Sequence, residues 1–225
     1  GNTGENFKRN ACNLRINLIL LAAGYARRFG AQKLLAPVDG MPMYLVTLQK
    51  LEEIKKHQDD CRIYAVTAEP EVADYCREHH ICCIRNEGEQ NTGIASSIKA
   101  AVKKLLEEDA ERRTAACDMF FTADQPFLCI QDAERFLNCY QLQGKKLGTM
   151  ECKGQWRNPN IFDASFRKEL SELPDDCGGK YILKKHPKEV YCFHTEEEEQ
   201  FFDIDTKADY DSLIHKNGNV SGKKS

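Results

Sequence analysis

The stretch "INLILLAAGYARRFGAQKLL", residues 16–35, joins a continuous apolar run to a segment rich in glycine and cationic side chains. The run 16–22 is short and uninterrupted, a form typical of a strand that is covered on both faces. Gly24 and Gly30 then permit backbone conformations that other residues resist. The stretch therefore predicts a buried strand that ends in a loop able to wrap closely around a ligand.

Three more apolar runs follow along the chain, at 62–68, 81–84 and 117–123. Between them, leucine, isoleucine and valine recur every three or four residues over 45–54 and 94–105, which is the spacing of one helix face. Strands that alternate with helices imply right-handed crossovers and a parallel sheet. We therefore predict an α/β fold, with a three-layer, Rossmann-like arrangement of a mainly parallel sheet and helices on both faces.

The second half of the chain is less regular, and we expect it to cover the sheet rather than to form an independent domain. We predict a single domain over 14–215, between polar segments 1–13 and 216–225 that are expected to be mobile. The patterns of the second half predict two helices, 132–142 and 164–173, and three strands, 149–154, 160–163 and 189–194.

The composition excludes several classes of protein. The 32 Lys and Arg residues balance 35 Asp and Glu residues, so no long-range field draws the protein to nucleic acid or to a membrane. No apolar run approaches the roughly 20 residues that span a bilayer, and the polar start lacks the apolar segment of a secretory signal. We expect a cytoplasmic protein. Its 11 cysteines, an odd number in a chain of this size, are expected to be reduced thiols.

The loop after the first strand has the composition of a polyphosphate site. Its backbone amides can cradle phosphate oxygens, and Arg27, Arg28 and Lys33 add positive charge. The spacing G-x5-G-x2-K differs from the Walker pattern, and Ala26 occupies the middle glycine position of G-x-G-x-x-G. Taken alone, the loop leaves open the alternative of a flexible basic turn.

Two later segments supply carboxylates. Asp124 ends the run "FFTADQPFL", and a metal ion at the carboxyl end of a central strand can bridge phosphate oxygens. The segment "FFDIDTKADYDSL", residues 201–213, places Asp203 and Asp205 at alternate positions of a predicted short strand, followed by a helix. Asp205 could complete a magnesium site with Asp124. The alternative is that Asp205 only caps the following helix.

The segment "NEGEQNTGIASSIKAAV", residues 86–102, places a polar loop after a strand and opens a helix with Gly93, Ser96 and Ser97. Unpaired amides at a helix start attract anions, and small residues let a base or ribose approach. Capping of the helix by the serines is the alternative interpretation.

In this order, the segments "LLAAGYARRFGAQK", "NEGEQNTGIASSIKAAV", "FFTADQP" and "FDIDTKADY" resemble the molybdenum cofactor cytidylyltransferases, a family with a MobA-like nucleotidyltransferase domain of the GT-A type. They cover the chain from about residue 16 to residue 213. The resemblance implies transfer of CMP from CTP to the phosphate of molybdopterin, which yields molybdopterin cytosine dinucleotide and pyrophosphate. A molybdenum hydroxylase would receive this product.

The resemblance also implies roles for individual residues. Asp124 and Asp205 fall on the family's metal-binding acids and would hold Mg²⁺, while Arg28 and Lys33 would stabilise charge on the α-phosphate and pyrophosphate. These four residues form the predicted catalytic set. The predicted nucleotide-binding residues are Leu21, Ala22, Ala23, Gly24, Arg28, Gly30, Lys33, Asn86, Gly93 and Ser97. The predicted acceptor-binding residues are Gln125, Trp156, Asn158, Pro159, Asp176, Gly178 and Gly179.

Two details qualify the resemblance. The form "LAAG", with Ala23, resembles the cytidylyl members, whereas guanylyl relatives usually carry "LAGG". The segment "GQWRNPNIF" departs from the family, which often has glycine, histidine and proline where this chain has Arg157 and Asn158 before Pro159. The nucleotide half of the site is therefore better supported than the acceptor half.

Three other interpretations stay open. The same site could serve another acceptor such as a sugar phosphate, or the chain could be a nucleotide-binding module without catalytic activity. A metal or redox protein built around "HHICC", residues 79–83, is the third. Cys82 and Cys83 would point to opposite faces of a strand, so we expect buried thiols there. Trp156 could stack on a flat pterin or could simply pack.

Overall fold

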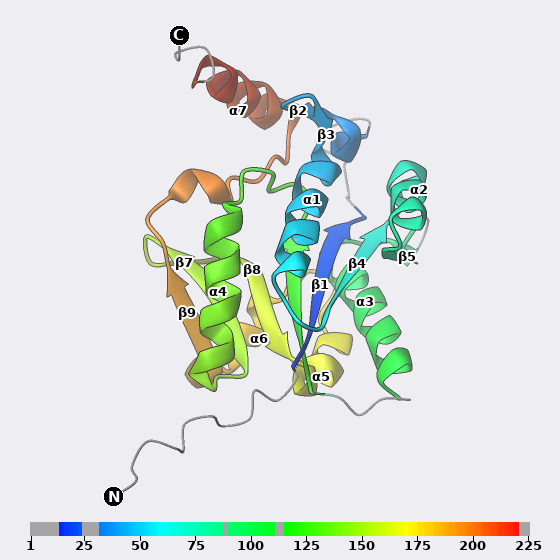
Figure 1. The fold of residues 1–225 in the computed structure, drawn as a ribbon, viewed down its shortest axis with the longest axis vertical. Coiled ribbons are helices and arrows are strands. Elements are labelled where there is room, and N and C mark those ends of the chain that lie inside the picture. The colour runs from blue at the N-terminus through cyan, green and yellow to red at the C-terminus, as the bar shows by residue number, and fades with distance from the viewer. Residues whose placement is uncertain (1–13, 24–31, 88–89, 111–114, 221–225) are drawn as a thin grey trace, which may run out of the picture.

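The computed structural model of the chain describes residues 14–23, 32–87, 90–110 and 115–220, and its centre is a seven-stranded sheet in the order β5-β4-β1-β6-β8-β7-β9 (Figure 1). Strands β5, β4, β1 and β6 run parallel, β8 is antiparallel to β6 and β7, and β9 is parallel to β7. The strands are β1 Arg15–Ala22, β4 Cys61–Thr67, β5 Cys82–Arg85, β6 Ala116–Thr122, β7 Leu147–Cys152, β8 Gln155–Asp163 and β9 Val190–His194.

Helices cover both faces of this sheet, so the predicted three-layer, mainly parallel α/β fold is confirmed. Helices α1, α2 and α4 pack on one face, and α3, α5 and α6 pack on the other (Figure 1). The helices are α1 Met43–Lys56, α2 Pro70–Glu78, α3 Ile94–Asp109, α4 Ile130–Gln143, α5 Arg167–Ser171, α6 Lys180–Lys185 and α7 Lys207–Val220. The short elements are η1 Lys33–Leu35, η3 Ala164–Phe166, η4 Pro187–Glu189, η5 Glu198–Phe201 and the β2–β3 pair, Pro37–Val38 with Met41–Pro42.

Strand β1 shows why the sheet needs two cores. Leu18 and Leu20 pack into the core under α1 and α4, while Ile19 and Leu21 pack into the core under α3. Because successive side chains of a strand point to opposite faces, a continuous apolar run serves both layers. Each fully buried side chain of this size contributes about 1.5–3 kcal/mol. The run "INLIL" therefore fixes the middle of the sheet.

Strand β5 separates the neighbouring cysteines as predicted. Cys83 packs against the core under α1 and α2, and Cys82 packs against the core under α3. The two thiols therefore lie on opposite faces of the sheet. All ten cysteines among the described residues are free thiols.

Two predicted elements differ from the structure. The strand predicted across Asp203 and Asp205 is wrong, because η5 ends at Phe201 and an irregular segment follows it. The amide of Ile204 donates to the carbonyl of Asp124 at 2.8 Å, so this segment lies against a loop and not against a strand edge. The helix predicted over 164–173 is divided into η3 and α5. Helix α7 extends to Val220, and the domain boundary at residue 215 stays a prediction.

A buried ion pair ties the central strands to the helical layer. Asp118 of β6 is completely buried and accepts two hydrogen bonds from Arg167 of α5, both of 2.8 Å. Asn17 of β1 donates to the same carboxylate at 2.9 Å, and Arg167 also pairs with Asp109 at the end of α3. One guanidinium thus joins β6, α3 and α5.

Among the helices that the structure describes, none has the length and apolar character needed to cross a membrane.

The ion pair yields a stability prediction. Arg167→Met leaves the buried carboxylate of Asp118 without its cation, so we expect the free energy of unfolding to fall by about 3–5 kcal/mol. Urea denaturation followed by circular dichroism measures this loss. Adding Asp118→Asn to the same chain removes the unpaired charge and should recover part of it. A single variant within about 1 kcal/mol of the parent would contradict a structural role for the pair.

Candidate functional site

The carboxyl ends of β1 and β6 open into a cavity of about 400 Å³, called here the Lys33 cavity. Open α/β sheets bind ligands at this edge, where strand order reverses. Helix α3 begins at its rim, with Gly93 as the N-terminal cap at φ 133°. The cavity is lined by Leu21, Ala23, Lys33, Leu34, Asn91, Gly93, Ile94, Ser97, Thr122, Asp124 and Asp205.

Lys33 brings a nearly buried cation into this cavity. Residue Gln32, with φ 47°, turns the chain into η1, and Lys33 is the first residue of that element. Lys33 is only 6% exposed, and its Nζ lies 3.3 Å from Oδ2 of Asp124. A charge so little exposed to water acts strongly on neighbouring charges. The pair therefore joins the loop before η1 to the loop after β6.

The Asp124 loop is held from two sides. Ile204 donates its amide hydrogen to the Asp124 carbonyl at 2.8 Å, which brings the segment with Asp205 against this loop. Lys50 of α1 donates to the carbonyls of Pro126 at 2.7 Å and Leu128 at 2.8 Å. These contacts place the carboxylates of Asp124 and Asp205 in the lining of one cavity.

The cap of helix α7 is built from two other side chains. The amide of Thr206 donates to Oδ2 of Asp209 at 3.0 Å, and the amide of Asp209 donates to Oγ1 of Thr206 at 3.0 Å. This reciprocal pair is a capping box, which satisfies amides at a helix start. The amide of Asp205 also donates to Asp209, at 3.2 Å. The carboxylate of Asp205 lines the Lys33 cavity.

A third carboxylate lies beside these two. Burial of the carboxyl group away from water raises the pKa of Asp203 to about 7. The negative charges of Asp124 and Asp205 raise it in the same direction. Arg157 and Lys33 oppose this shift. Asp203 still keeps part of its surface open to solvent. Burial is the larger cause of this shift, and the two neighbouring acids add to it.

The start of α3 is stabilised by a buried amide. Asn86, which is 3% exposed, donates from Nδ2 to Oγ of Ser96 at 3.1 Å and to Oγ of Ser97 at 3.0 Å. Ser96 also accepts the amide hydrogen of Thr92 at 3.1 Å. Asn91 crosses the cavity edge and donates to the carbonyl of Ala23 at 2.7 Å. The polar loop before α3 is therefore tied to the end of β1.

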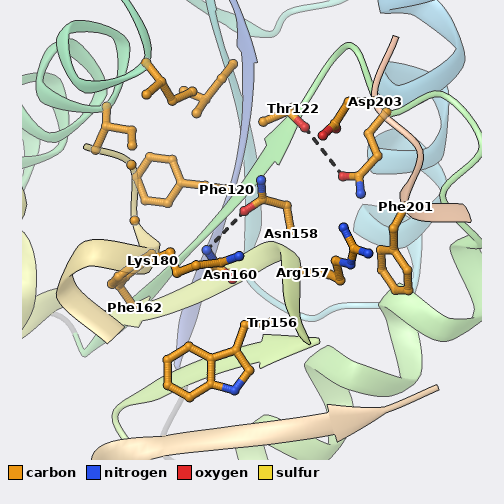
Figure 2. Close-up of a pocket in the computed structure, with 16 residues that line it drawn as sticks. Phe120, Thr122, Trp156, Arg157, Asn158, Asn160, Phe162, Lys180, Phe201 and Asp203 are labelled. Atoms are coloured by element: carbon orange, nitrogen blue, oxygen red, sulfur yellow. Dashed lines mark hydrogen bonds between the residues drawn. The ribbon is translucent and has the colours of Figure 1, made fainter. Parts of the chain in front are cut away.

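A second cavity, called here the Trp156 cavity, adjoins the first and has a volume of about 160 Å³. Leu21, Ile94 and Thr122 line both cavities. Figure 2 shows Trp156 on one side and Thr122 with Asp203 on the other, with Asn158 and Asn160 between them. The lining residues are Leu21, Ile94, Ile98, Phe120, Thr122, Gln125, Trp156, Arg157, Asn158, Asn160, Phe162, Gly178, Gly179, Lys180, Phe201 and Asp203.

The polar wall of the Trp156 cavity is anchored by its own hydrogen bonds. Thr149 of β7 donates to Oδ1 of Asn160 at 2.9 Å. Nδ2 of Asn160 in turn donates to Oδ1 of Asn158 at 3.0 Å (Figure 2). Oγ1 of Thr122 donates to Oε1 of Gln125 at 3.5 Å in the turn after β6, and both residues line the same cavity. The hydrogen bonds of Asn160 hold the side-chain amides of Asn158 and Asn160, in the β7–β8 hairpin, beside the central strands.

The structure brings most predicted site residues to these two cavities. Leu21, Ala23, Lys33, Gly93, Ser97, Asp124 and Asp205 line the Lys33 cavity. Gln125, Trp156, Asn158, Gly178 and Gly179 line the Trp156 cavity. The predicted residues Ala22, Asn86, Pro159 and Asp176 do not line either one. Ala22 packs in the core, Asn86 supports α3, and Asp176 is exposed. Gly24, Arg28 and Gly30, with Arg27, lie outside the described residues.

Sequence reasoning missed several lining residues. Asn91 stood within a quoted motif, yet nothing in its spacing revealed its bond to Ala23. Lys180 directly follows two glycines, and this pattern at a helix start was its only signal. Phe201 carried no signal of its own, because it reaches the Trp156 cavity only through the irregular course of the chain after β9.

Two groups of side chains could offer ligands to a metal ion. Asp124 and Asp205 offer carboxylates in the Lys33 cavity, the ligands that Mg²⁺ prefers. The described residues also contain one group of three potential ligands within 4.8 Å, namely Cys129, Asp132 and Glu197. Asp132 there already accepts hydrogen bonds from Thr195 and Gln200. That second group is partly exposed and lies outside both cavities.

Comparison with known proteins gives one matching family model, the MobA-like NTP transferase domain, over residues 18–190. A probable molybdenum cofactor guanylyltransferase of Thermococcus gammatolerans is 26% identical over 211 residues, covering 88% of this chain and 97% of that protein.

Solved structures share the fold at lower identity. Rv0371c of Mycobacterium tuberculosis H37Rv has a TM-score of 0.72 at 19% identity, over 90% of this chain and 99% of that one. A second structure of the same protein, in complex with manganese, has a TM-score of 0.65 at 17% identity, over 90% and 98%. Molybdopterin-guanine dinucleotide biosynthesis protein A of Archaeoglobus fulgidus has a TM-score of 0.65 at 15% identity, over 90% and 99%.

The two glycines of the Trp156 cavity yield a matched prediction. A Cβ at Gly179 would lie 2.7 Å from Cζ of the buried Phe162, whereas a Cβ at Gly178 would lie 3.9 Å from Cγ2 of Ile94. We expect Gly179→Ala to cost about 1–3 kcal/mol of stability through overpacking. Gly178→Ala should stay within about 0.5 kcal/mol of the parent. Thermal unfolding of both variants tests this, and equal melting temperatures would contradict the tight packing of Gly179.

Proposed function

Because the chain belongs to the MobA-like NTP transferase family and is a nucleotidyltransferase, we propose that it transfers CMP from CTP to the phosphate of the molybdopterin cofactor. The products are molybdopterin cytosine dinucleotide, which a molybdenum hydroxylase then receives, and pyrophosphate. One observation carries the proposal. The Lys33 cavity and the Trp156 cavity adjoin along shared walls, with Asp124 beside the junction. A nucleotide and an acceptor phosphate can therefore meet there.

The Lys33 cavity is the proposed nucleotide site. Lys33 supplies positive charge for the phosphates, and the start of α3 at Gly93 turns backbone amides toward an anion. Ser97 and Asn91 add polar groups beside the end of β1. Ala23 lines the same wall, where its methyl group limits how closely a base can approach the backbone.

The charges of this site favour a divalent metal in the proposed reaction. Among the described lining residues of the Lys33 cavity, Asp124 and Asp205 stand against the ammonium of Lys33, and a triphosphate adds further negative charge. Without another cation the acids would repel the substrate. Nucleotidyltransferases of this family typically use a divalent metal. We therefore propose Mg²⁺ on Asp124 and Asp205, where it would neutralise phosphate oxygens.

The proposed reaction needs no general base. The acceptor phosphate is already anionic near neutral pH, so one of its oxygens can attack the α-phosphorus of CTP directly. A new phosphoanhydride bond forms, the bond between the α- and β-phosphates breaks, and pyrophosphate leaves with both bonding electrons. The protein then contributes position and charge. Lys33 is the described cation that would stabilise the charge that develops on the phosphates.

GTP is the second candidate nucleotide, because the relative from Thermococcus gammatolerans is named a guanylyltransferase. The methyl group of Ala23 favours CTP in our proposal. A single methyl group typically changes substrate discrimination by about 10- to 200-fold. The choice between CTP and GTP can therefore be tested at Ala23, which can be changed without altering the proposed metal ligands.

The catalytic roles predict large losses of rate. We expect Lys33→Ala and Asp124→Ala each to lower pyrophosphate release by about 100- to 1,000-fold, because each removes a group aimed at developing charge. The assay combines purified protein, CTP, molybdopterin and Mg²⁺. Lys56→Ala is the matched control, since this lysine of α1 is 70% exposed and lies outside both cavities. Near-normal turnover by either site variant would exclude its assigned role.

The nucleotide preference is tested with a substrate panel. The parent protein should release pyrophosphate with CTP and molybdopterin faster than with GTP, and Ala23→Gly should lower the CTP:GTP ratio of kcat/KM by about tenfold or more. A preference for GTP would support the guanylyl candidate. Turnover only with sugar phosphates would identify a sugar phosphate as the acceptor. Nucleotide binding without any turnover would support a nucleotide-binding module without catalytic activity.

A further inference from the structure

Two cations line the Trp156 cavity without an ion-pair partner. Arg157 comes from β8, and Lys180 is the first residue of α6, so separate elements bring them to one cavity. Within the described ranges, neither forms a salt bridge within 4.0 Å. In the view of Figure 2, Asn158 and Asn160 lie between them. Asp203 lines the same cavity and offsets part of this charge, so the two cations leave an excess of positive charge that an anionic ligand can neutralise.

The guanidinium of Arg157 also contains a buried hydrogen-bond donor that has no acceptor among the described residues. Its Nε is buried, and no described group accepts a hydrogen bond from it. Leaving a buried donor unsatisfied costs about 1–3 kcal/mol, and more for a charged group. The backbone carbonyl of Arg157 lies 3.1 Å from Oγ1 of Thr149, whose one hydrogen is shared with Oδ1 of Asn160 at 2.9 Å. The cost of the unpaired donor is relieved when a ligand supplies an acceptor atom.

The surroundings of Lys180 point in the same direction. Burial lowers the pKa of its ammonium, and the positive charges of Lys184 and Arg157 lower it further. Asp203 opposes this shift, and the segment with Asp203 also carries the proposed metal ligand Asp205. Lys180 is solvent-exposed at the cavity, with two positive charges and Asp203 as its charged neighbours.

We propose that Arg157 and Lys180 form an anion subsite that selects a phosphomonoester as acceptor over an uncharged alcohol. The proposal rests on the proposed function and names the group that the Trp156 cavity recognises. An arginine fork can hold two phosphate oxygens at once, while a lysine adds a compact charge. A phosphate dianion satisfies both cations and the buried Nε. A hydroxyl acceptor leaves both charges unpaired.

The ring of Trp156 gives the subsite a flat apolar neighbour. Trp156 lines the same cavity and is adjacent to Arg157 in the chain. The preferred ligand class is therefore a phosphomonoester carried on a planar ring system, since a planar ring stacks on an indole face. Trp156 is also the single tryptophan of the chain, so its fluorescence reports binding in this cavity directly.

Fluorescence titration of the full chain with phenyl phosphate tests the subsite, with phenol as the uncharged counterpart. We expect phenyl phosphate to bind more tightly than phenol, and we expect Arg157→Gln and Lys180→Gln each to weaken its binding by about tenfold or more. Arg157→Lys keeps the charge but loses the fork, so its affinity should fall between those of the parent and Arg157→Gln. Lys184→Gln is the matched control, because it removes a charge from the same helix outside the cavity.

The outcomes separate this inference from the proposed function. Equal binding of phenyl phosphate and phenol, or an equal loss in Lys184→Gln, would overturn the subsite even if pyrophosphate is released with molybdopterin. Selective loss in Arg157→Gln and Lys180→Gln would support the subsite even if no turnover with molybdopterin is found. Circular dichroism of each variant identifies misfolding, and a folded Arg157→Lys variant that binds phenyl phosphate as weakly as it binds phenol would also overturn the subsite.

Discussion

The hydrogen bond from the Ile204 amide to the Asp124 carbonyl, at 2.8 Å, is the contact on which the site depends. It joins the end of a central strand to a segment that lies far along the chain. Ile204 is completely buried, so its side chain fixes the segment while its amide fixes the Asp124 loop. The residues on either side of Ile204 are acids, and one anchor therefore brings both of them to the same edge of the sheet.

This anchor works against electrostatic repulsion. The protein holds Asp203 near Asp124 and Asp205, and burial together with these charges raises the pKa of Asp203 to about 7. An arrangement of this kind costs stability, and proteins retain such costs at functional sites. The cost is met by apolar packing elsewhere, because both faces of the sheet carry a continuous core. The rigid core is what allows a strained cluster of charges at the sheet edge.

The sequence predicted the sheet better than it predicted the site. The run "INLIL" could be predicted to be a buried strand from its own residues, because a strand covered on both faces is continuously apolar. The residues of the cavity walls could not be predicted in this way. Asn91, Arg157 and Lys180 reach the cavities only because the topology brings together elements that are distant in the sequence. The strand predicted across Asp203 and Asp205 failed for the same reason. Its alternation of apolar and acidic residues is typical of a strand, yet the segment lies against a loop that offers no ladder of backbone partners.

The two cavities differ in the sign of their charge, and this difference suits two different anions. Asp124 and Asp205 line the Lys33 cavity, whereas Arg157 and Lys180 line the Trp156 cavity. A triphosphate that arrives with a divalent metal matches carboxylates, because the metal reverses the local charge. A phosphomonoester without metal matches Arg157 and Lys180, whose positive charges outnumber the one carboxylate, Asp203, in that lining. On the proposed assignment, each substrate is disfavoured in the cavity of the other, and the two substrates meet where Leu21, Ile94 and Thr122 line both cavities.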